Sequence, residues 1–88
     1  MFNCPTPHFS IVIPIGFMFI QCRQNEEDEI LQRISRIDGV IYAYKLDKSY
    51  DIVVKIESES AEKFTTAISL IRAIGGILNT DTMVGFKP

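Results

Sequence analysis

The sequence predicts an α+β fold with the element order β-α-β-β-α-β and a four-stranded antiparallel sheet. Residues 40–46 and 50–56 are rich in β-branched and aromatic side chains, and the turn between them contains Asp47, Lys48 and Ser49. A helical pattern flanks this hairpin on each side, and one further strand lies beyond each helix. This order is that of a ferredoxin-like plait, in which right-handed crossovers place both helices on one face of the sheet.

The first strand, residues 15–22, is apolar on both of its alternating sides. Phe17 and Phe19 point one way, and Met18 and Ile20 point the other. A strand that is apolar on both sides is covered on both sides, so the helix layer accounts for only one of its faces.

The first helix is predicted to begin at Asn25, whose side chain would cap the amide of Asp28. Its apolar positions fall on one helical face and are Ile30, Leu31, Ile34 and Ile37. Gly39 follows and is expected in the left-handed conformation, which other residues reach only at a steric cost.

The second helix is predicted to begin at Ser58 or Ser60 and to end at Gly75-Gly76. Its apolar stripe consists of Phe64, Ala67, Ile68 and Ile71. In the last strand, residues 77–86, successive side chains point to alternate sides of the sheet. One side carries Leu78, Thr80, Thr82, Val84 and Phe86, and the other carries Asn79, Asp81 and Met83.

The face of the sheet away from the helices is predicted to be apolar. Ile52, Val54 and Ile56 are expected to face the helices. The opposite face would carry the first strand's outer side chains together with one of two pairs, Ile41 and Ala43 or Tyr42 and Tyr44. A patch of this size exceeds what a soluble monomer exposes. We therefore expect a homodimer packed sheet to sheet, a dimeric α/β barrel-like assembly.

Composition limits the possible functions. The 88 residues suffice for one domain, predicted over residues 15–88 and preceded by an N-terminal extension, residues 1–14. Nine basic and eleven acidic residues, with no long basic run, argue against direct binding of nucleic acid. The apolar run at residues 11–20 is too short to span a membrane. With two separated cysteines and one histidine, no metal or cofactor is expected, and reduced thiols suit a cytoplasmic protein.

The pair Tyr50-Asp51, which opens the third strand, is the candidate functional feature. In a structural role, Asp51 would accept backbone amides of its own turn. In a binding role, residues 47–51, with Thr80 and Thr82 of the same or a neighbouring chain, would hold a small zwitterion. Amide donors would bind its carboxylate, and Asp51 or the threonine hydroxyls would bind its ammonium.

The ordered set of motifs resembles the effector-binding domain of the Lrp/AsnC regulators, also called the RAM domain, in its stand-alone form. The resemblance covers roughly residues 15–87. It rests on Ile37-Asp38-Gly39-Val40, on Tyr50-Asp51-Ile52, and on Ile74-Gly75-Gly76-Ile77 leading into Thr80-Asp81-Thr82. At Lys48 the family usually has glycine.

The resemblance implies dimers with facing sheets, rings of such dimers, and an amino-acid effector bound between dimers near the hairpin turn. It implies the ligand residues Lys48, Ser49, Tyr50, Asp51, Thr80 and Thr82. It also implies a non-enzymatic role in transcription regulation, beside a DNA-binding regulator of the same family. The alternatives are an interaction or chaperone module that uses its sheet face, and an acylphosphatase-like hydrolase. The hydrolase is disfavoured because residues 23–25 lack the glycines of an anion-binding loop.

Overall fold

The computed structural model describes residues 13–47 and 49–87 of the chain. Its elements are β1 (Ile13–Cys22), α1 (Glu27–Ser35), β2 (Val40–Lys45), β3 (Ile52–Glu57), α2 (Ala61–Arg72) and β4 (Ile77–Lys87). The strands form one four-stranded sheet in the order β2-β3-β1-β4, and every neighbouring pair is antiparallel. The predicted fold class and element order are confirmed.

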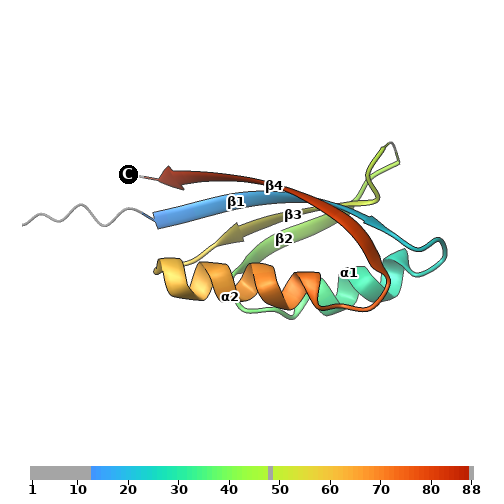
Figure 1. Ribbon diagram of the computed structural model, residues 1–88, viewed down its shortest axis with the longest axis horizontal. Coiled ribbons are helices and arrows are strands. Elements are labelled where there is room, and N and C mark those ends of the chain that lie inside the picture. Colours follow the sequence, from blue (N-terminus) through green and yellow to red (C-terminus); the bar gives the residue numbers. More distant parts are fainter. Residues whose placement is uncertain (1–12, 48, 88) are drawn as a thin grey trace, which may run out of the picture.

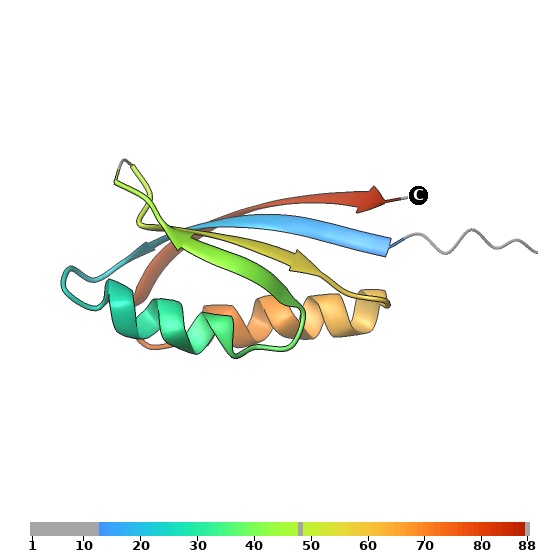
Figure 2. The ribbon, with the colours of Figure 1, turned by 180° about the vertical axis from the view of Figure 1, so that it is seen from behind.

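The molecule has two layers. Both helices lie against the same face of the twisted sheet, below it in Figure 1, and the view from behind shows the same arrangement (Figure 2). The strands β1 and β3 are central, and β2 and β4 form the edges. One face of the sheet is therefore covered by helices, and the other has no covering layer among the described residues.

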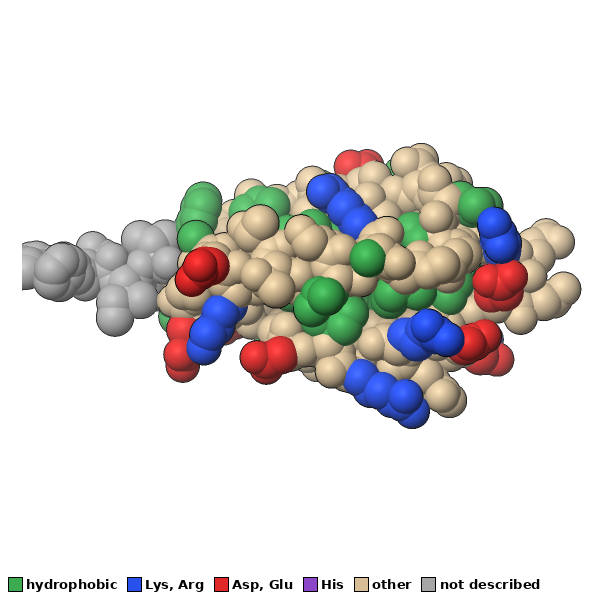
Figure 3. All heavy atoms as spheres, turned by 60° about the horizontal axis from the view of Figure 1, so that its bottom comes forward, with side chains coloured by type: hydrophobic (Ala, Val, Ile, Leu, Met, Phe, Trp, Pro, Cys, Tyr) green, Lys and Arg blue, Asp and Glu red, His purple; other side chains and the backbone are tan. Residues whose placement is uncertain are grey.

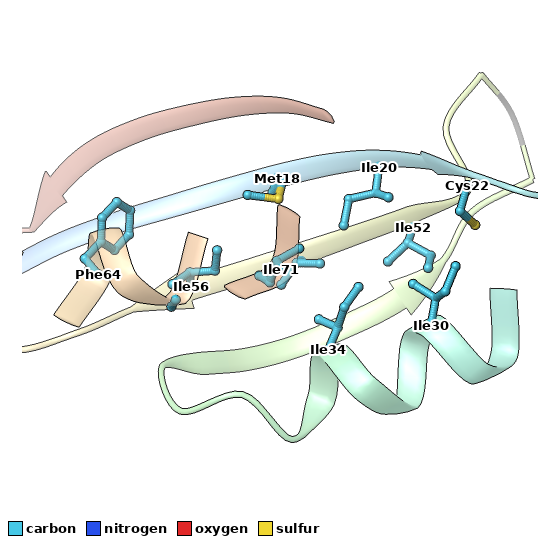
Figure 4. Packing of buried hydrophobic residues seen from close by; sticks show 11 residues of the cluster. Met18, Ile20, Cys22, Ile30, Ile34, Ile52, Ile56, Phe64 and Ile71 are labelled. Atoms are coloured by element: carbon cyan, nitrogen blue, oxygen red, sulfur yellow. The ribbon is translucent and has the colours of Figure 1, made fainter. Parts of the chain in front are cut away.

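The core lies between the two layers and is wholly apolar (Figure 4). Its buried members are Met18, Ile20, Cys22, Ile30, Ile34, Ile52, Val54, Ile56, Phe64, Ala67 and Ile71. The alternation in β1 is as predicted, with Met18 and Ile20 fully buried and Phe17 half-buried on the other side. Gly16 lets α2 approach closely, because a Cβ at this position would lie 2.7 Å from the Phe64 ring.

The strand β1 begins at Ile13 rather than Ile15 and includes Pro14, which is buried. Pairing with β4 extends back to Ile13, whereas pairing with β3 begins only at Ile15. Proline has no N–H to donate, and Pro14 lies where β1 has a single neighbouring strand, a position of the kind that tolerates proline.

The two helices begin differently. The prediction that Asn25 caps α1 is wrong, because Asn25 adopts φ 69° and the N-cap residue is Glu26, without a capping side-chain hydrogen bond. Asn25 instead lies in a turn closed by the Glu26 N–H, which donates to the Arg23 carbonyl at 3.2 Å. Asparagine tolerates this left-handed conformation better than most residues. At α2, Ser60 is the N-cap, and its hydroxyl accepts a hydrogen bond from the Lys63 N–H at 3.1 Å.

The pairing of β2 decides which of its side chains line the open side of the sheet. An irregularity between Val40 and Tyr42 shifts the register, after which Tyr42 lies opposite Lys55 and Tyr44 opposite Val53. Tyr42 and Tyr44 therefore line the open side, with their rings stacked at 4.9 Å. The alternative pair is excluded, since Ala43 packs against the core.

Candidate functional site

The predicted site residues lie on two different segments. Ser49, Tyr50 and Asp51 belong to the connection between β2 and β3, and Lys48 lies outside the described residues. Thr80 and Thr82 lie on β4, which is separated from β3 by β1. Strands are about 4.8 Å apart, so the two segments are separated by about 10 Å across the sheet.

Asp51 makes three hydrogen bonds of 2.8 Å that connect the start of β3 to the end of β1 and to the residue after β2. Its N–H donates to the Ile20 carbonyl, and its carbonyl accepts from the Leu46 N–H. Its carboxylate oxygen Oδ2 accepts from the Cys22 N–H, the last amide of β1. Asp51 was predicted to accept backbone amides of its own turn. That prediction is wrong about the donor, because the amide that Asp51 accepts belongs to the neighbouring strand β1.

The buried thiol of Cys22 lies in acidic surroundings. Burial raises the pKa of Cys22 above its ordinary value, and the negative charges of Asp51, Glu27 and Glu26 raise it further. Each of these effects disfavours the thiolate, which is the nucleophilic form of cysteine. Cys22 is thus a buried core residue whose surroundings favour the neutral thiol. The described residues hold no group of three or more His, Cys, Asp or Glu side chains arranged for a metal ion.

Tyr50 and the two threonines face opposite sides of the sheet. The Tyr50 ring packs on Phe19 at 5.6 Å, on the side away from the helices. Thr80 lies opposite Ile20 and Thr82 opposite Met18, on the side that faces the helices. The described part of one chain therefore does not bring Tyr50 and the two threonines together around a single ligand.

The hydroxyl of Thr82 is buried and has no hydrogen-bond partner among the described residues. A buried polar atom without a partner is costly, and most such atoms in folded proteins are satisfied by protein or water. Thr82 therefore retains hydrogen-bonding capacity on the helix-facing side of β4.

A hairpin-end polar cluster was not predicted from the sequence; it consists of Gln21, Ser49, Tyr50, Asn79 and Asp81. The Gln21 side-chain amide donates to the Ser49 carbonyl at 2.8 Å and accepts from the Asn79 amide at 3.3 Å. The Tyr50 hydroxyl donates to an Asp81 carboxylate oxygen in a long hydrogen bond of 3.4 Å. The period-two pattern does place Asn79 and Asp81 on one side of β4, but only strand pairing brings them beside Gln21 and Tyr50.

The side of the sheet away from the helices, called the open face below, is apolar in its centre. The central side chains are Ile15, Phe17, Phe19, Tyr42, Tyr44, Val53 and Met83. Tyr44 is 60% exposed and Met83 is 58% exposed. Charged residues lie around this centre, among them an ion pair of Lys87 with Glu57 at 3.1 Å.

The helix-covered face differs in character from the open face. Figure 3 shows basic and acidic side chains interspersed over this surface, without a broad area of one sign. A hollow of about 590 Å³ follows the exposed side of α2, lined by Ala61, Glu62, Thr65, Thr66, Ser69 and Leu70, away from the hairpin. No helix in the described part of the chain has the length and apolarity required to cross a membrane.

The sequence model of the Lrp/AsnC ligand binding domain matches residues 15–88. The HTH-type transcriptional regulator FL11 of Pyrococcus horikoshii is 25% identical over 73 residues, which cover 83% of this chain and 48% of the regulator. The chain thus spans about half the length of the curated relatives it matches.

Solved structures show the same fold. A hypothetical protein from Pyrococcus horikoshii superposes with a TM-score of 0.76 at 25% identity, covering 82% of this chain and 88% of the other. AsnC of E. coli gives 0.71 at 23% identity, covering 82% of this chain and 50% of the other. A transcriptional regulator of Neisseria meningitidis, solved as a complex with L-Met, gives 0.69 at 12% identity, with coverages of 84% and 50%.

Proposed function

This chain belongs to the Lrp/AsnC ligand-binding domain family, and we propose that it binds a small amino-acid-like effector as a homodimer packed sheet to sheet. In this role it is a non-enzymatic, cytoplasmic regulatory domain. It contacts no nucleic acid itself, and its effect on transcription passes through a DNA-binding regulator of the same family.

The observation that carries the homodimer is the apolar open face. Phe17 and Phe19 of β1 and the stacked pair Tyr42 and Tyr44 of β2 lie on it without a covering layer in the described structure. Aromatic side chains of this kind dominate the energetics of interfaces. A second copy presents the same apolar centre, so two open faces cover each other.

The ligand is proposed to lie at the hairpin end of the sheet. Backbone amides of the hairpin turn would bind its carboxylate, and the Asp51 carboxylate, which also accepts the Cys22 N–H, would bind its ammonium. Because Thr80 and Thr82 face the other side of the sheet, they would reach a ligand from another dimer in a ring. The L-Met complex of the Neisseria regulator supports an amino acid as the class of ligand.

The ligand is tested by a thermal-shift screen of the twenty amino acids. A ligand at about 100 times its dissociation constant stabilises the folded chain by about 2.7 kcal/mol, so at least one amino acid should raise the melting temperature measurably. Thr80→Val removes the hydroxyl of a half-buried predicted ligand residue while keeping the shape of the side chain. It should weaken the affinity for that amino acid without lowering the stability of the free protein. No shift with any of the twenty would overturn the proposed ligand class.

The homodimer is tested separately by sedimentation equilibrium at micromolar concentration. A dimer of the 10.0 kDa chain, or an oligomer built from such dimers, is expected. A single species of monomer mass would overturn the homodimer. It would leave the open face available to an apolar peptide, as in the interaction or chaperone module that the sequence left as an alternative.

A further inference from the structure

We propose that Lys55 of one copy forms an ion pair with Asp81 of the second copy, twice across the interface, and that these two pairs set how one sheet lies on the other. The inference rests on the homodimer proposed above and adds the residues that orient it.

The charges on the open face are not fully paired among the described residues of one chain. Glu57 and Lys87 pair with each other at 3.1 Å. The Lys55 ammonium lies 5.9 Å from the centre of the Tyr42 ring, and Asp81 accepts a long hydrogen bond from the neutral Tyr50 hydroxyl. Within the described part of the chain, neither Lys55 nor Asp81 has an opposite charge within salt-bridge distance. One cation and one anion thus remain beside an apolar centre.

Covering this face with a second copy makes the two unpaired charges costly. Taking a charge out of water is unfavourable unless an opposite charge or hydrogen bonds replace the water. When two identical faces meet, each copy presents one unpaired cation, Lys55, and one unpaired anion, Asp81, to the other copy. Both charges gain a partner when Lys55 of each copy pairs with Asp81 of the other copy.

The sheet register makes this arrangement compatible with twofold symmetry. Lys55 lies opposite Phe17 on one side of β1, and Asp81 lies opposite Phe19 on the other side. The line from Lys55 to Asp81 therefore crosses β1 between Phe17 and Phe19, within the apolar centre. A twofold axis that lies midway between the two sheets, directly over that point and perpendicular to the line, exchanges the two positions, so each Lys55 meets the partner's Asp81.

The same axis packs the two phenylalanines against those of the second copy. Strand and residue spacings place Lys55 and Asp81 about 12 Å apart in one chain, so the two ion pairs lie well separated on either side of the axis. Two separated pairs resist rotation of one sheet on the other, whereas an apolar centre alone does not select one orientation.

The test is a charge exchange in the full chain, followed by sedimentation equilibrium. Asp81→Lys and Lys55→Glu are each expected to raise the dimer dissociation constant by about tenfold or more, because each places like charges together. The double variant restores opposite charges and should return the constant to within about threefold of the parent. Lys63→Glu reverses an exposed charge on α2 and serves as the matched control, with no change expected.

The possible results distinguish failure of the proposed ion pair from failure of the proposed homodimer. A parent chain that is monomeric would overturn both. A dimeric parent with unchanged dissociation constants in the single variants, or a double variant weaker than either single, would overturn the ion pair and leave the homodimer in place. If an exchanged variant loses its far-ultraviolet circular dichroism, Asp81→Asn and Lys55→Gln measure the loss of the pair without charge reversal. Unchanged constants in those two variants would equally overturn it.

Discussion

Replacing Asp51 with alanine removes a side-chain hydrogen bond that joins the start of β3 to the end of β1. The Asp51 carboxylate accepts the Cys22 N–H at 2.8 Å, a short distance for a bond between an amide and a charged oxygen. The two backbone hydrogen bonds of Asp51, to Ile20 and from Leu46, do not depend on the side chain and remain in the variant. The variant is therefore expected to lose the free energy of one hydrogen bond, the one between the Asp51 carboxylate and the Cys22 N–H.

Its magnitude follows from the environment of the bond. Hydrogen bonds to charged groups contribute about 1.5–3 kcal/mol. This bond is only partly buried, so water can replace the carboxylate at the Cys22 amide, and we expect Asp51→Ala to lower the free energy of unfolding by about 1–2 kcal/mol. For a domain of this size that corresponds to a fall in melting temperature of about 4–16 °C. Asp51→Asn keeps an acceptor oxygen and should cost less than about 1 kcal/mol.

The assay is urea unfolding followed by circular dichroism, at one protein concentration because dimerisation contributes to the measured stability. Asp47→Ala is the matched control, since Asp47 is exposed in the same turn. Equal unfolding midpoints for Asp51→Ala and Asp47→Ala would refute the reasoning. The Asp51→Asn variant then separates two roles: near-normal stability with weakened ligand affinity would assign the carboxylate to the ligand as well as to the sheet.

Three further predictions concern the core and the turns. Ile52→Ala empties a fully buried site and should destabilise the fold by about 2–5 kcal/mol, and a urea-derived loss below about 1 kcal/mol would contradict the packing. Gly76→Ala should cost more than about 1 kcal/mol, because Gly76 has φ 97° and its Cβ would press on the start of α1. Gly75→Ala meets open space and should be close to neutral, so equal midpoints would be contrary evidence. In a Cys4→Ser background, Cys22 should react slowly with a thiol reagent at neutral pH, because its raised pKa keeps it protonated, and rapidly in denaturant. Fast reaction of the folded protein would count against its burial.

Much of the fold could be predicted from the sequence because it depends on local periodicity. Period-two patterns identified the strands, and period-3.6 patterns identified the two helices. The alternation of Phe17 and Met18 in β1 also predicted which of its side chains face the helices. The positive φ of Gly39 was likewise foreseeable, because a glycine after a helix commonly takes this conformation.

The failure at Asn25 also has a local cause. Asparagine is favoured both as a helix N-cap and in left-handed turn positions. The tight turn from β1 into α1 requires the second of these, and φ 69° at Asn25 shows that it is the one adopted.

Only the tertiary structure decided which residues of different strands lie together. The irregularity after Val40 placed Tyr42 and Tyr44 on the open face, and a shift of one residue would have placed Ala43 there. Pairing of β4 with β1 turned Thr80 toward the helices and brought Asp81 to Tyr50. A sequence pattern states which side chains of one strand share a side. Which side is covered, and which strand lies next to it, depends on hydrogen bonds between segments far apart in the chain.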